Sequence, residues 1–304
     1  MHIGIDLGGT KIEAAVLDAQ GGFRFRERLA TPQGDYPATL QAIGALIERA
    51  ESVLSEACTA IGVGHPGSAD PVSGRIRNAN STCLNDQPLR HDLEALTQRR
   101  VCLANDADCL ALSEATDGVA RGFDHVFAVI LGTGVGGGWF IHGRLLQGPN
   151  GLAGEWGHNP LPIAQADEWP GPRCYCGKQG CNEAWLSGPG LVADYQRTTG
   201  DSRPIDVRGL VAAADAGNIP ARDALTRHTR RLARALGMII NICDPQVIVL
   251  GGGVSQRPRL ITDLLDVLSS HVFLPAVTPL GTKFLLPKFG DSSGVRGAAR
   301  LAAS

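Results

Sequence analysis

The feature that most constrains the fold of this chain is a strand that runs into a glycine loop and continues as a second strand. The pattern occurs at 3–15, around DLGGTK, and again at 127–141, around GTGVGGG. A recurrence of this kind indicates two related halves. A third glycine loop, GGG at 251–253, also follows an apolar strand. With 304 residues, the chain is long enough for about two domains of roughly 150 residues, or one large one.

Strand and helix patterns alternate along the rest of the chain. Alternating or continuous apolar runs predict strands at 2–7, 11–17, 23–29, 59–63, 101–103, 125–131, 139–142 and 247–250. Apolar residues three or four apart predict helices at 36–58, 91–100 and 222–242, one beginning near Ala107, and one over the last residues. Asp35 can cap the first helix, and Asp291 or Ser292 the last. This alternation predicts an α/β fold with helices covering sheets.

Charge and composition exclude several classes of protein. The net charge is −2 and no basic run is present, which argues against a nucleic-acid partner. No stretch reaches the ~20 apolar residues of a membrane span. The N-terminal MHIGIDLGGTK has neither the basic start nor the apolar run of a signal peptide. We therefore expect a cytoplasmic protein with no membrane partner, in which clustered cysteines bind metal or do redox work.

The three glycine loops indicate a nucleotide site. Glycine lets backbone N–H groups approach phosphate oxygens, and Thr10 and Lys11 add a hydroxyl donor and a positive charge. Plain turns remain the alternative. Gly132, Gly134 and Gly137 formally match a dinucleotide fingerprint, but that motif must open a helix, and WFI after the glycines favours a strand. No Walker motif is present, so a β-hairpin with a phosphate-binding tip is the preferred interpretation.

Two aspartates follow predicted strands. Asp6 stands beside the first glycine loop, where a carboxylate can hold Mg²⁺, usually through water; the alternative is a turn-capping Asp. Asn105 and Asp106 come directly after a buried strand and before a helix. Asp106 is placed either to cap that helix or to act as a general base, because phosphoryl transfer to an alcohol needs a carboxylate near the attacking hydroxyl.

Six motifs in order, DLGGTK, LANDADC, LGTGVGGG, GEWGH, CYCGKQGCNE and VIVLGGG, resemble those of the ROK family over nearly the whole chain. The resemblance implies an actin-like ATPase (ribonuclease H-like) fold with two domains, mixed sheets flanked by helices, and a central cleft. We expect domains at 1–115, joined by the C-terminal helix 290–304, and at 116–289, which includes the segment 154–183. The family's repressors carry a DNA-binding domain before DLGGTK, and we expect none here.

The resemblance also implies roles for individual residues. The first phosphate loop would be Gly8, Gly9, Thr10 and Lys11, the second Gly132, Thr133 and Gly134, and Gly251, Gly252 and Gly253 would lie by the adenosine. Sugar hydroxyls would meet Asn105, Asp106, Glu155, His158 and Glu183, with Gly67 and Asn80 nearby. Asp106 would be the general base, and the two domains would close on the sugar and exclude water.

A cysteine cluster stands in the same region as the implied sugar residues. Cys174, Cys176, Cys181 and His158 match a Cys₃His zinc set, which fills the tetrahedral coordination of Zn²⁺ and so indicates a structural rather than a hydrolytic metal. Three buried thiols beside an unrelated histidine are the alternative. The segment PLPIAQADEWPGPR separates His158 from Cys174 and is longer than usual in the family.

These observations predict an ATP- and Mg²⁺-dependent hexose kinase with a structural zinc, acting on a 6-hydroxyl and forming a homodimer as its relatives usually do. NANSTCLN, GEWGHNPLP and GDSSGVRGAA most resemble bacterial fructokinases that also accept mannose, so fructose is the expected substrate. A kinase for N-acetylglucosamine or glucose is the alternative within the family. Outside that class, the alternatives are a non-catalytic sugar sensor and a dinucleotide oxidoreductase.

Overall fold

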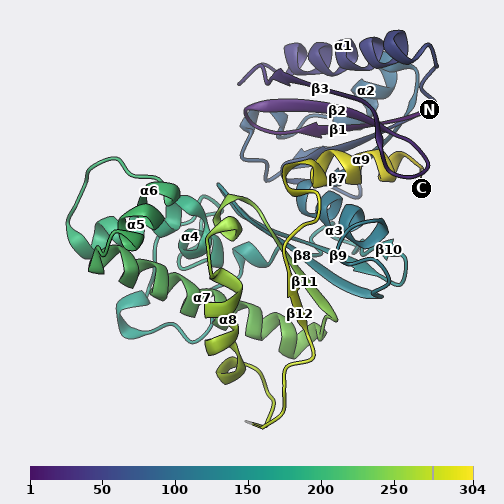
Figure 1. Cartoon of the computed structure of the whole chain (residues 1–304). Helices are drawn as coiled ribbons and strands as arrows, with labels where there is room; N and C mark the ends of the chain where they lie inside the picture. Colours follow the sequence, from purple (N-terminus) through teal and green to yellow (C-terminus); the bar gives the residue numbers. More distant parts are fainter. Residues whose placement is uncertain (276, 304) are drawn as a thin grey trace. The chain divides into compact units, whose positions relative to one another are not determined.

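The computed structural model describes residues 1–275 and 277–303 (Figure 1). The chain divides into two compact units. Unit 1 contains Met1–Asp124, Gly138–Ala153 and the chain from Pro287 on, and unit 2 contains His125–Gly137 and Gly154–Leu286. This division differs from the expected one, whose boundary at 115/116 falls at the end of a helix and which leaves 138–153 with the second domain. In this division the described residues 287–303 belong to unit 1; Ser304 lies outside the described residues.

The sheet of unit 1 is mixed. Its order is β3 (Phe23–Ala30), β2 (Lys11–Leu17), β1 (His2–Leu7), β4 (Ala60–His65) and β7 (Arg100–Asn105). β1 and β2 form a hairpin in which Leu7 pairs with Ile12, and β4 and β7 extend the sheet in parallel. The first glycine loop is therefore the tip of a hairpin, as the sequence predicted. A short hairpin of β5 (Ser68–Ala69) and β6 (Ile76–Arg77) follows β4.

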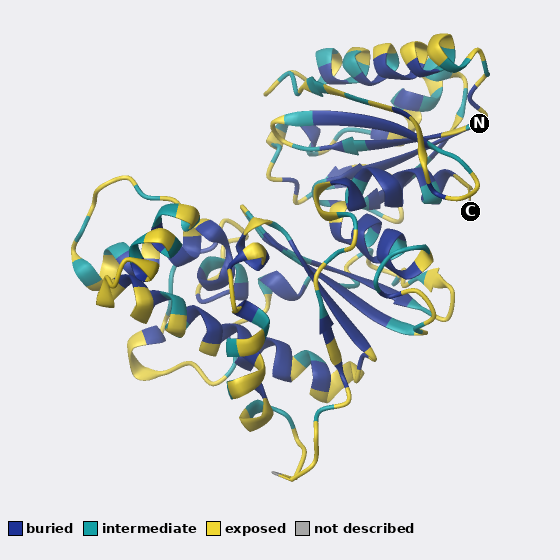
Figure 2. Ribbon diagram, viewed as in Figure 1, coloured by how far each residue is buried: buried dark blue, intermediate teal, exposed yellow. Residues whose placement is uncertain are grey.

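Helices cover both faces of this sheet. Residues of α1 (Tyr36–Leu54) and α2 (Leu89–Thr97) join Ile3 and Ile5 in one core, while α3 (Asp106–Thr116) and α9 (Ser293–Ala303) pack together on the other side. Glycine permits the close approach of α9, because a Cβ on Gly62 would lie 1.9 Å from the Ala298 oxygen. Figure 2 shows buried central strands in the sheet of unit 1, with α1 exposing its outer face to solvent.

Two predicted helices have different ends. The first was expected to continue to Cys58 but stops at Leu54, because Ser55 adopts a left-handed conformation (φ 48°) and its N–H closes on the Glu51 oxygen. The second was expected at 91–100 but ends at Thr97, where Gln98 is left-handed, and Arg100 already belongs to β7. In both cases the apolar spacing runs past a residue that ends the helix.

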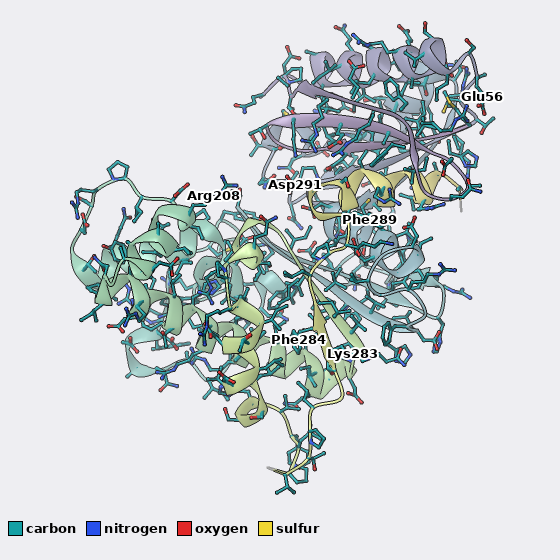
Figure 3. All side chains as sticks on the ribbon, viewed as in Figure 1. Glu56, Arg208, Lys283, Phe284, Phe289 and Asp291 are labelled. Atoms are coloured by element: carbon teal, nitrogen blue, oxygen red, sulfur yellow. The ribbon has the colours of Figure 1, made fainter. Side chains whose placement is uncertain are left out.

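The last helix begins directly after Ser292, one of its two expected caps. Gly290–Ser292 form a 3-10 turn, and α9 starts at Ser293, whose hydroxyl donates to Glu114 Oε1 at 2.8 Å. Phe289, labelled in Figure 3, lies under the guanidinium of Arg296, 3.6 Å from carbon to ring centroid. The start of α9 is thus held by a contact to α3 and by a contact between Phe289 and the helix itself.

The second sheet has the order β10 (Arg144–Leu145), β9 (Val135–Ile141), β8 (His125–Leu131), β11 (Val247–Gly251) and β12 (Lys283–Leu285). β8, β11 and β12 run parallel. β9 begins four residues earlier than the predicted strand at 139–142, so much of GTGVGGG is strand. Since a strand and not a helix follows Gly137, the dinucleotide-binding alternative was wrong.

In the described part of unit 2, five α-helices pack mainly against one another: α4 (Asn182–Leu186), α5 (Gly188–Thr199), α6 (Val207–Asp215), α7 (Ile219–Cys243) and α8 (Leu260–Leu268). Only α7 was predicted, at 222–242. It starts earlier because Asn218 caps it, accepting from the Ala221 N–H, and it ends at left-handed Asp244 before Pro245. Within the described chain, no helix combines the length and apolar character needed to cross a membrane.

Candidate functional site

The first glycine loop is a tight hairpin tip. The Gly8 N–H donates to the Lys11 oxygen at 2.9 Å, and the Thr31 hydroxyl donates to the Gly8 oxygen at 2.7 Å. Gly9 and Thr10 are exposed, and the Thr10 oxygen accepts from the Thr31 N–H at 3.1 Å. A Cβ on Gly9 would lie 3.2 Å from Ser81 Oγ, which brings the tip beside the segment that holds Asn80. The Asn85 side chain fixes that segment by binding both backbone groups of Ala79.

Asp6 lies among carboxylates at the start of this tip. It pairs with Glu13 in the hairpin register. Burial, together with the negative charges of Asp106 and Glu13, raises the pKa of Asp6 to about 6, while Lys11 and Arg28 act in the opposite direction. Within the described chain no hydrogen bond to its carboxylate is found, which argues against the turn-capping alternative. A half-buried carboxylate crowded by others is a donor that fits a hard divalent cation.

Asp106 is the first residue of α3, and its neighbour performs the capping. The Asn105 side chain accepts from the Asp108 N–H at 2.6 Å, so Asn105 is the N-cap. The capping alternative for Asp106 was therefore wrong. Asp106 is exposed at the N-terminus of α3, and its Oδ1 accepts from the Ala107 N–H at 2.8 Å.

A pocket of about 260 Å³ in unit 1 opens beside Asn105 at the carboxyl ends of β4 and β7. The buried His65 lines it, and His65 Nδ1 lies 3.0 Å from the Pro66 oxygen. Gly67 follows with φ 76°, and a Cβ there would lie 2.4 Å from the Arg77 oxygen, so this bend requires glycine. Asp108 and Arg90 complete the polar part of the wall.

The other two glycine loops lie together in unit 2. Gly188 N–H donates to the Gly132 oxygen at 2.8 Å, and a Cβ on Gly252 would lie 2.3 Å from the Leu131 oxygen. Between the loops is a pocket of about 490 Å³ that contains Gly132, Thr133 and Gly253. Its apolar wall comes from Pro189, Val192, Ile205, Val207 and Val254. An apolar slot beside exposed loop amides suits a nucleotide base and its phosphates.

Glu183 connects the cysteine segment to the second glycine loop. Its Oε2 accepts from the Val135 N–H at 2.9 Å, and its Oε1 lies 4.0 Å from Cys174 Sγ. Glu155 stands directly before the 3-10 turn Trp156–His158 and is half-buried. Trp156 anchors that turn: it is 3% exposed, and its indole N–H donates to the Gly136 oxygen at 2.9 Å.

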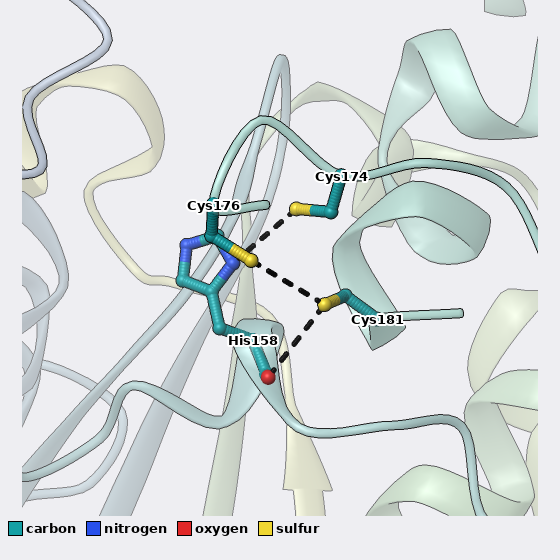
Figure 4. Close-up of side chains that lie close together, drawn as sticks. All are labelled: His158, Cys174, Cys176 and Cys181. Carbon is teal, nitrogen blue, oxygen red and sulfur yellow. Dashed lines mark hydrogen bonds between the residues drawn. The ribbon is translucent and has the colours of Figure 1, made fainter. Parts of the chain in front are cut away.

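His158, Cys174, Cys176 and Cys181 form one cluster (Figure 4), with all their ligand atoms within 4.8 Å of one another. His158 Nδ1 lies 3.5 Å from Cys174 Sγ, and Cys176 Sγ lies 3.7 Å from Cys181 Sγ. A disulfide needs about 2.05 Å between sulfurs, and all eight cysteines are free. Ligands around tetrahedral Zn²⁺ would be about 3.5–3.8 Å apart, given Zn–S bonds of about 2.3 Å and Zn–N of about 2.0 Å. The four donors fit that metal in type and spacing.

The long segment between His158 and Cys174 is anchored at two places. Leu161 N–H donates to the Gly180 oxygen at 2.8 Å, which holds its start against the cysteine turn. Further along, Glu168 is buried against α7 and binds Arg231 and Arg234 at 2.7–2.8 Å. Arg231 also binds Asp194 at 3.1 Å and lies 4.2 Å above the ring of Trp185. The extra length is therefore a packed loop that leaves the cluster intact.

The predicted site residues fall into two sets. Unit 1 holds Asp6, the 8–11 tip, Gly67, Asn80, Asn105 and Asp106; unit 2 holds Gly132–Gly134, Glu155, His158, Glu183, Gly251–Gly253 and the three cysteines. Sequence reasoning overlooked Glu13, Glu168 and Tyr175. Of these, Tyr175 alone had a local signal, because it lies between the two predicted metal ligands Cys174 and Cys176.

The two mixed α/β sheets and their flanking helices define an actin-like ATPase fold, the class expected from the sequence. The chain belongs to the ROK family, whose model matches residues 2–304. It is 38% identical over 99% of both chains to an N-acetyl-D-glucosamine kinase of Escherichia coli O139:H28. It is also 38% identical to the N-acetylgalactosamine kinase AgaK of Shewanella sp. ANA-3, over 99% of this chain and 96% of that protein.

Among solved structures, the ROK hexokinase of Thermus thermophilus superposes with a TM-score of 0.86 at 33% identity, covering 99% of this chain and 97% of that one. The expected nearness to fructokinases was wrong, because these curated relatives are kinases of N-acetylated hexosamines. The three motifs behind that expectation are short, whereas the similarity to these kinases extends over nearly the whole chain.

Proposed function

We propose that this chain is an ATP-dependent sugar kinase that phosphorylates the 6-hydroxyl of an N-acetylated hexosamine, N-acetylglucosamine first. The observation that carries the proposal is the pair formed by Asp6 and Asp106 at the end of the unit 1 sheet, in a chain 38% identical to kinases of that substrate class. A sensor that only binds sugar has no use for two adjacent carboxylates beside a phosphate-type loop.

The proposed roles follow from position and charge. Asp106 accepts the proton of the attacking hydroxyl, since it is an exposed carboxylate at the start of α3, directly after β7. Gly9 and Thr10 offer exposed backbone groups to phosphate oxygens, with Lys11 adding positive charge. Asp6 would hold magnesium, which, bound with ATP, supplies charge neutralisation at the phosphates.

In unit 2, the pocket between the glycine loops at Gly132 and Gly253 would take the nucleotide, with the base against its apolar wall. Glu155, His158 and Glu183 would bind sugar hydroxyls, and Asn105, Gly67 and Asn80 would do so from unit 1. The 260 Å³ pocket beside Asn105 offers room for a substituent of the sugar.

The cluster of His158 and three cysteines would hold a structural zinc. Four N and S donors fill a tetrahedral metal, so no position remains for a reacting water. Its proposed task is to fix the turn that presents Glu155 and the helix start that presents Glu183.

A coupled assay for ADP release tests the function. We expect turnover with Mg-ATP, and the highest kcat/KM for N-acetylglucosamine or N-acetylgalactosamine among a panel that also contains glucose, mannose and fructose. A higher kcat/KM for fructose or glucose would refute the substrate class. The absence of sugar-dependent ADP release with every member, from protein that binds the sugars, would favour a sensor.

A further inference from the structure

Tyr175 contacts the imidazole of His158 on the side away from the cysteines. Its hydroxyl lies 3.1 Å from Nε2, and the two rings meet edge to face, with centroids 5.2 Å apart and planes at 89°. The other ring nitrogen, Nδ1, faces Cys174 Sγ at 3.5 Å. Tyr175 thus bonds the one nitrogen of His158 that the metal-ligand set does not use.

The Tyr175 hydroxyl also lies in the field of the carboxylates proposed to hold the sugar. Both glutamates lie near the cluster, since Glu183 Oε1 is 4.0 Å from Cys174 Sγ and Glu155 directly precedes the turn Trp156–His158. The side chain is nevertheless 63% exposed. It can therefore turn away from His158 without disturbing a packed core.

His158 has a single proton to offer at this position. An imidazole that gives its Nδ1 lone pair to a metal carries its proton on Nε2, and one N–H donates well to one oxygen. The tyrosine oxygen and a sugar hydroxyl oxygen would both accept a hydrogen bond from the same N–H. This N–H cannot form a well-aligned hydrogen bond with both oxygens at once.

We propose that the Tyr175 hydroxyl takes the place of a sugar hydroxyl at His158 Nε2, and that the sugar displaces it on binding. The inference rests on the proposed function, because it takes His158 and its neighbouring glutamates as sugar contacts. Tyr175 then lowers the affinity for every sugar whose hydroxyl meets Nε2, and it discriminates least against a sugar that lacks that hydroxyl. It is a specificity-determining residue and takes no part in phosphoryl transfer.

The test is calorimetric titration of the zinc-loaded protein with N-acetylglucosamine, comparing wild type with Tyr175→Phe. The substitution keeps the ring contact and removes only the competing oxygen. We expect the Kd for the sugar to fall by about 2- to 10-fold, the net effect of one hydrogen bond. Zinc content should stay at the wild-type value. Tyr36→Phe, which removes a hydroxyl bound to Asp92 in unit 1, is the matched control and should leave Kd unchanged.

Singly deoxygenated analogues of the sugar locate the competing oxygen. The analogue that lacks the hydroxyl meeting Nε2 should bind wild type and Tyr175→Phe equally, while the others keep the gain. If Tyr175→Phe binds the sugar no more tightly than wild type, the inference is overturned while the proposed function stands. The same holds if Tyr175→Phe binds every analogue more tightly than wild type does. If neither protein binds any of the sugars, the proposed function fails and the inference fails with it.

Discussion

At the scale of single residues, the proposed chemistry depends on two pairs of neighbouring side chains, Asn105 with Asp106 and Glu13 with Asp6. In each pair the first residue has the structural role. Asn105 is the N-cap of α3, and the adjacent Asp106 stays exposed, with its Oδ1 accepting from the Ala107 N–H. In the hairpin, Glu13 is fully buried but binds the guanidinium groups of Arg26 and Arg28, so its charge is compensated. Among the described residues no arginine forms an ion pair with Asp6, and the pKa of Asp6 stays raised.

Replacement of Asp106 by Asn tests the general base. Because a positioned base contributes ~10²- to 10⁴-fold, kcat should fall by about that factor while the Kd for the sugar stays close to the wild-type value. The fold should persist, since the cap of α3 is Asn105. Steady-state kinetics and calorimetry on the same preparation check this, and near-normal turnover would remove Asp106 from the mechanism.

Replacement of Asp6 by Asn should make the magnesium-free protein more stable at neutral pH. The Asp6 carboxyl ionises near pH 3.8 when unfolded but near pH 6 in the fold, so ionisation opposes folding as the pH rises through this interval. The stabilisation should reach up to about 3 kcal/mol above pH 6 and disappear below about pH 4. Activity should fall at the same time.

Thermal unfolding of Asp6→Asn at pH 4, 5, 6 and 8 measures this difference. Asp223→Asn, an exposed change on α7, is the control and should show no such pH-dependent gain. A variant that is less stable than wild type at pH 8 would show that Asp6 is held by a favourable contact.

At the scale of elements, left-handed residues and buried ion pairs decide where segments end and how loops are fixed. Apolar spacing identified α1 and α2, but left-handed Ser55 and Gln98 ended them. The segment after His158 has no regular spacing at all, yet Glu168 fixes it to α7 through two arginines. Contacts of that kind join residues more than 60 positions apart and leave no local pattern in the sequence.

Truncation of Glu168 to Ala should destabilise the protein by about 3–5 kcal/mol, because Arg231 and Arg234 are then buried without this partner. Burial alone would raise the pKa of Glu168, but hydrogen bonds from Gln165 and the two arginines hold it below its usual range. The loss should therefore be present above about pH 5 and shrink as the acid is protonated at lower pH.

Denaturant unfolding at pH 7 and pH 4 measures the effect. Asp263→Ala breaks an exposed pair with Arg259 on α8 and should change the stability little. Equal losses for Glu168→Ala and Asp263→Ala would show that the buried network does not anchor the loop.

At the scale of the whole molecule, the fold distributes the proposed site over two units, and the metal cluster organises the part in unit 2. His158 and Cys174 are separated by 15 residues, 159–173. The cluster joins the turn of Glu155 to the helix start of Glu183, and Glu183 in turn binds the second glycine loop through Val135. One metal ion would therefore help to position both the glutamates proposed to bind the sugar and the second glycine loop.

Removal of one exposed ligand tests this. Cys176→Ser should reduce bound zinc from about one per chain, lower Tm by roughly 5 °C or more, and weaken sugar binding. Cys243→Ser, also an exposed thiol but outside the cluster, should keep wild-type zinc content, Tm and Kd. Elemental analysis, thermal unfolding and calorimetry supply the three values. Full sugar affinity in zinc-free Cys176→Ser would contradict the proposed role of the cluster.

The amino-acid sequence by itself determined the α/β class, the β1–β2 hairpin, the long helix α7 and the four members of the cysteine cluster. These depend on local periodicity, on turn residues and on ligand types at short spacing, all of which can be read within a few residues. The expected nearness to fructokinases rested on three short motifs, whereas the similarity to kinases of N-acetylated hexosamines extends over nearly the whole chain.

Tertiary structure alone decided the rest. The glycines at 136–138 proved to be strand, since Gly137 packs where a Cβ would lie 2.6 Å from the Phe127 ring. The raised pKa of Asp6, the anchoring of the loop by Glu168 and the contact of Tyr175 with His158 all depend on residues brought together by folding. The physical reason is that charge, burial and close approach depend on distances in space, which the order of residues along the chain does not specify.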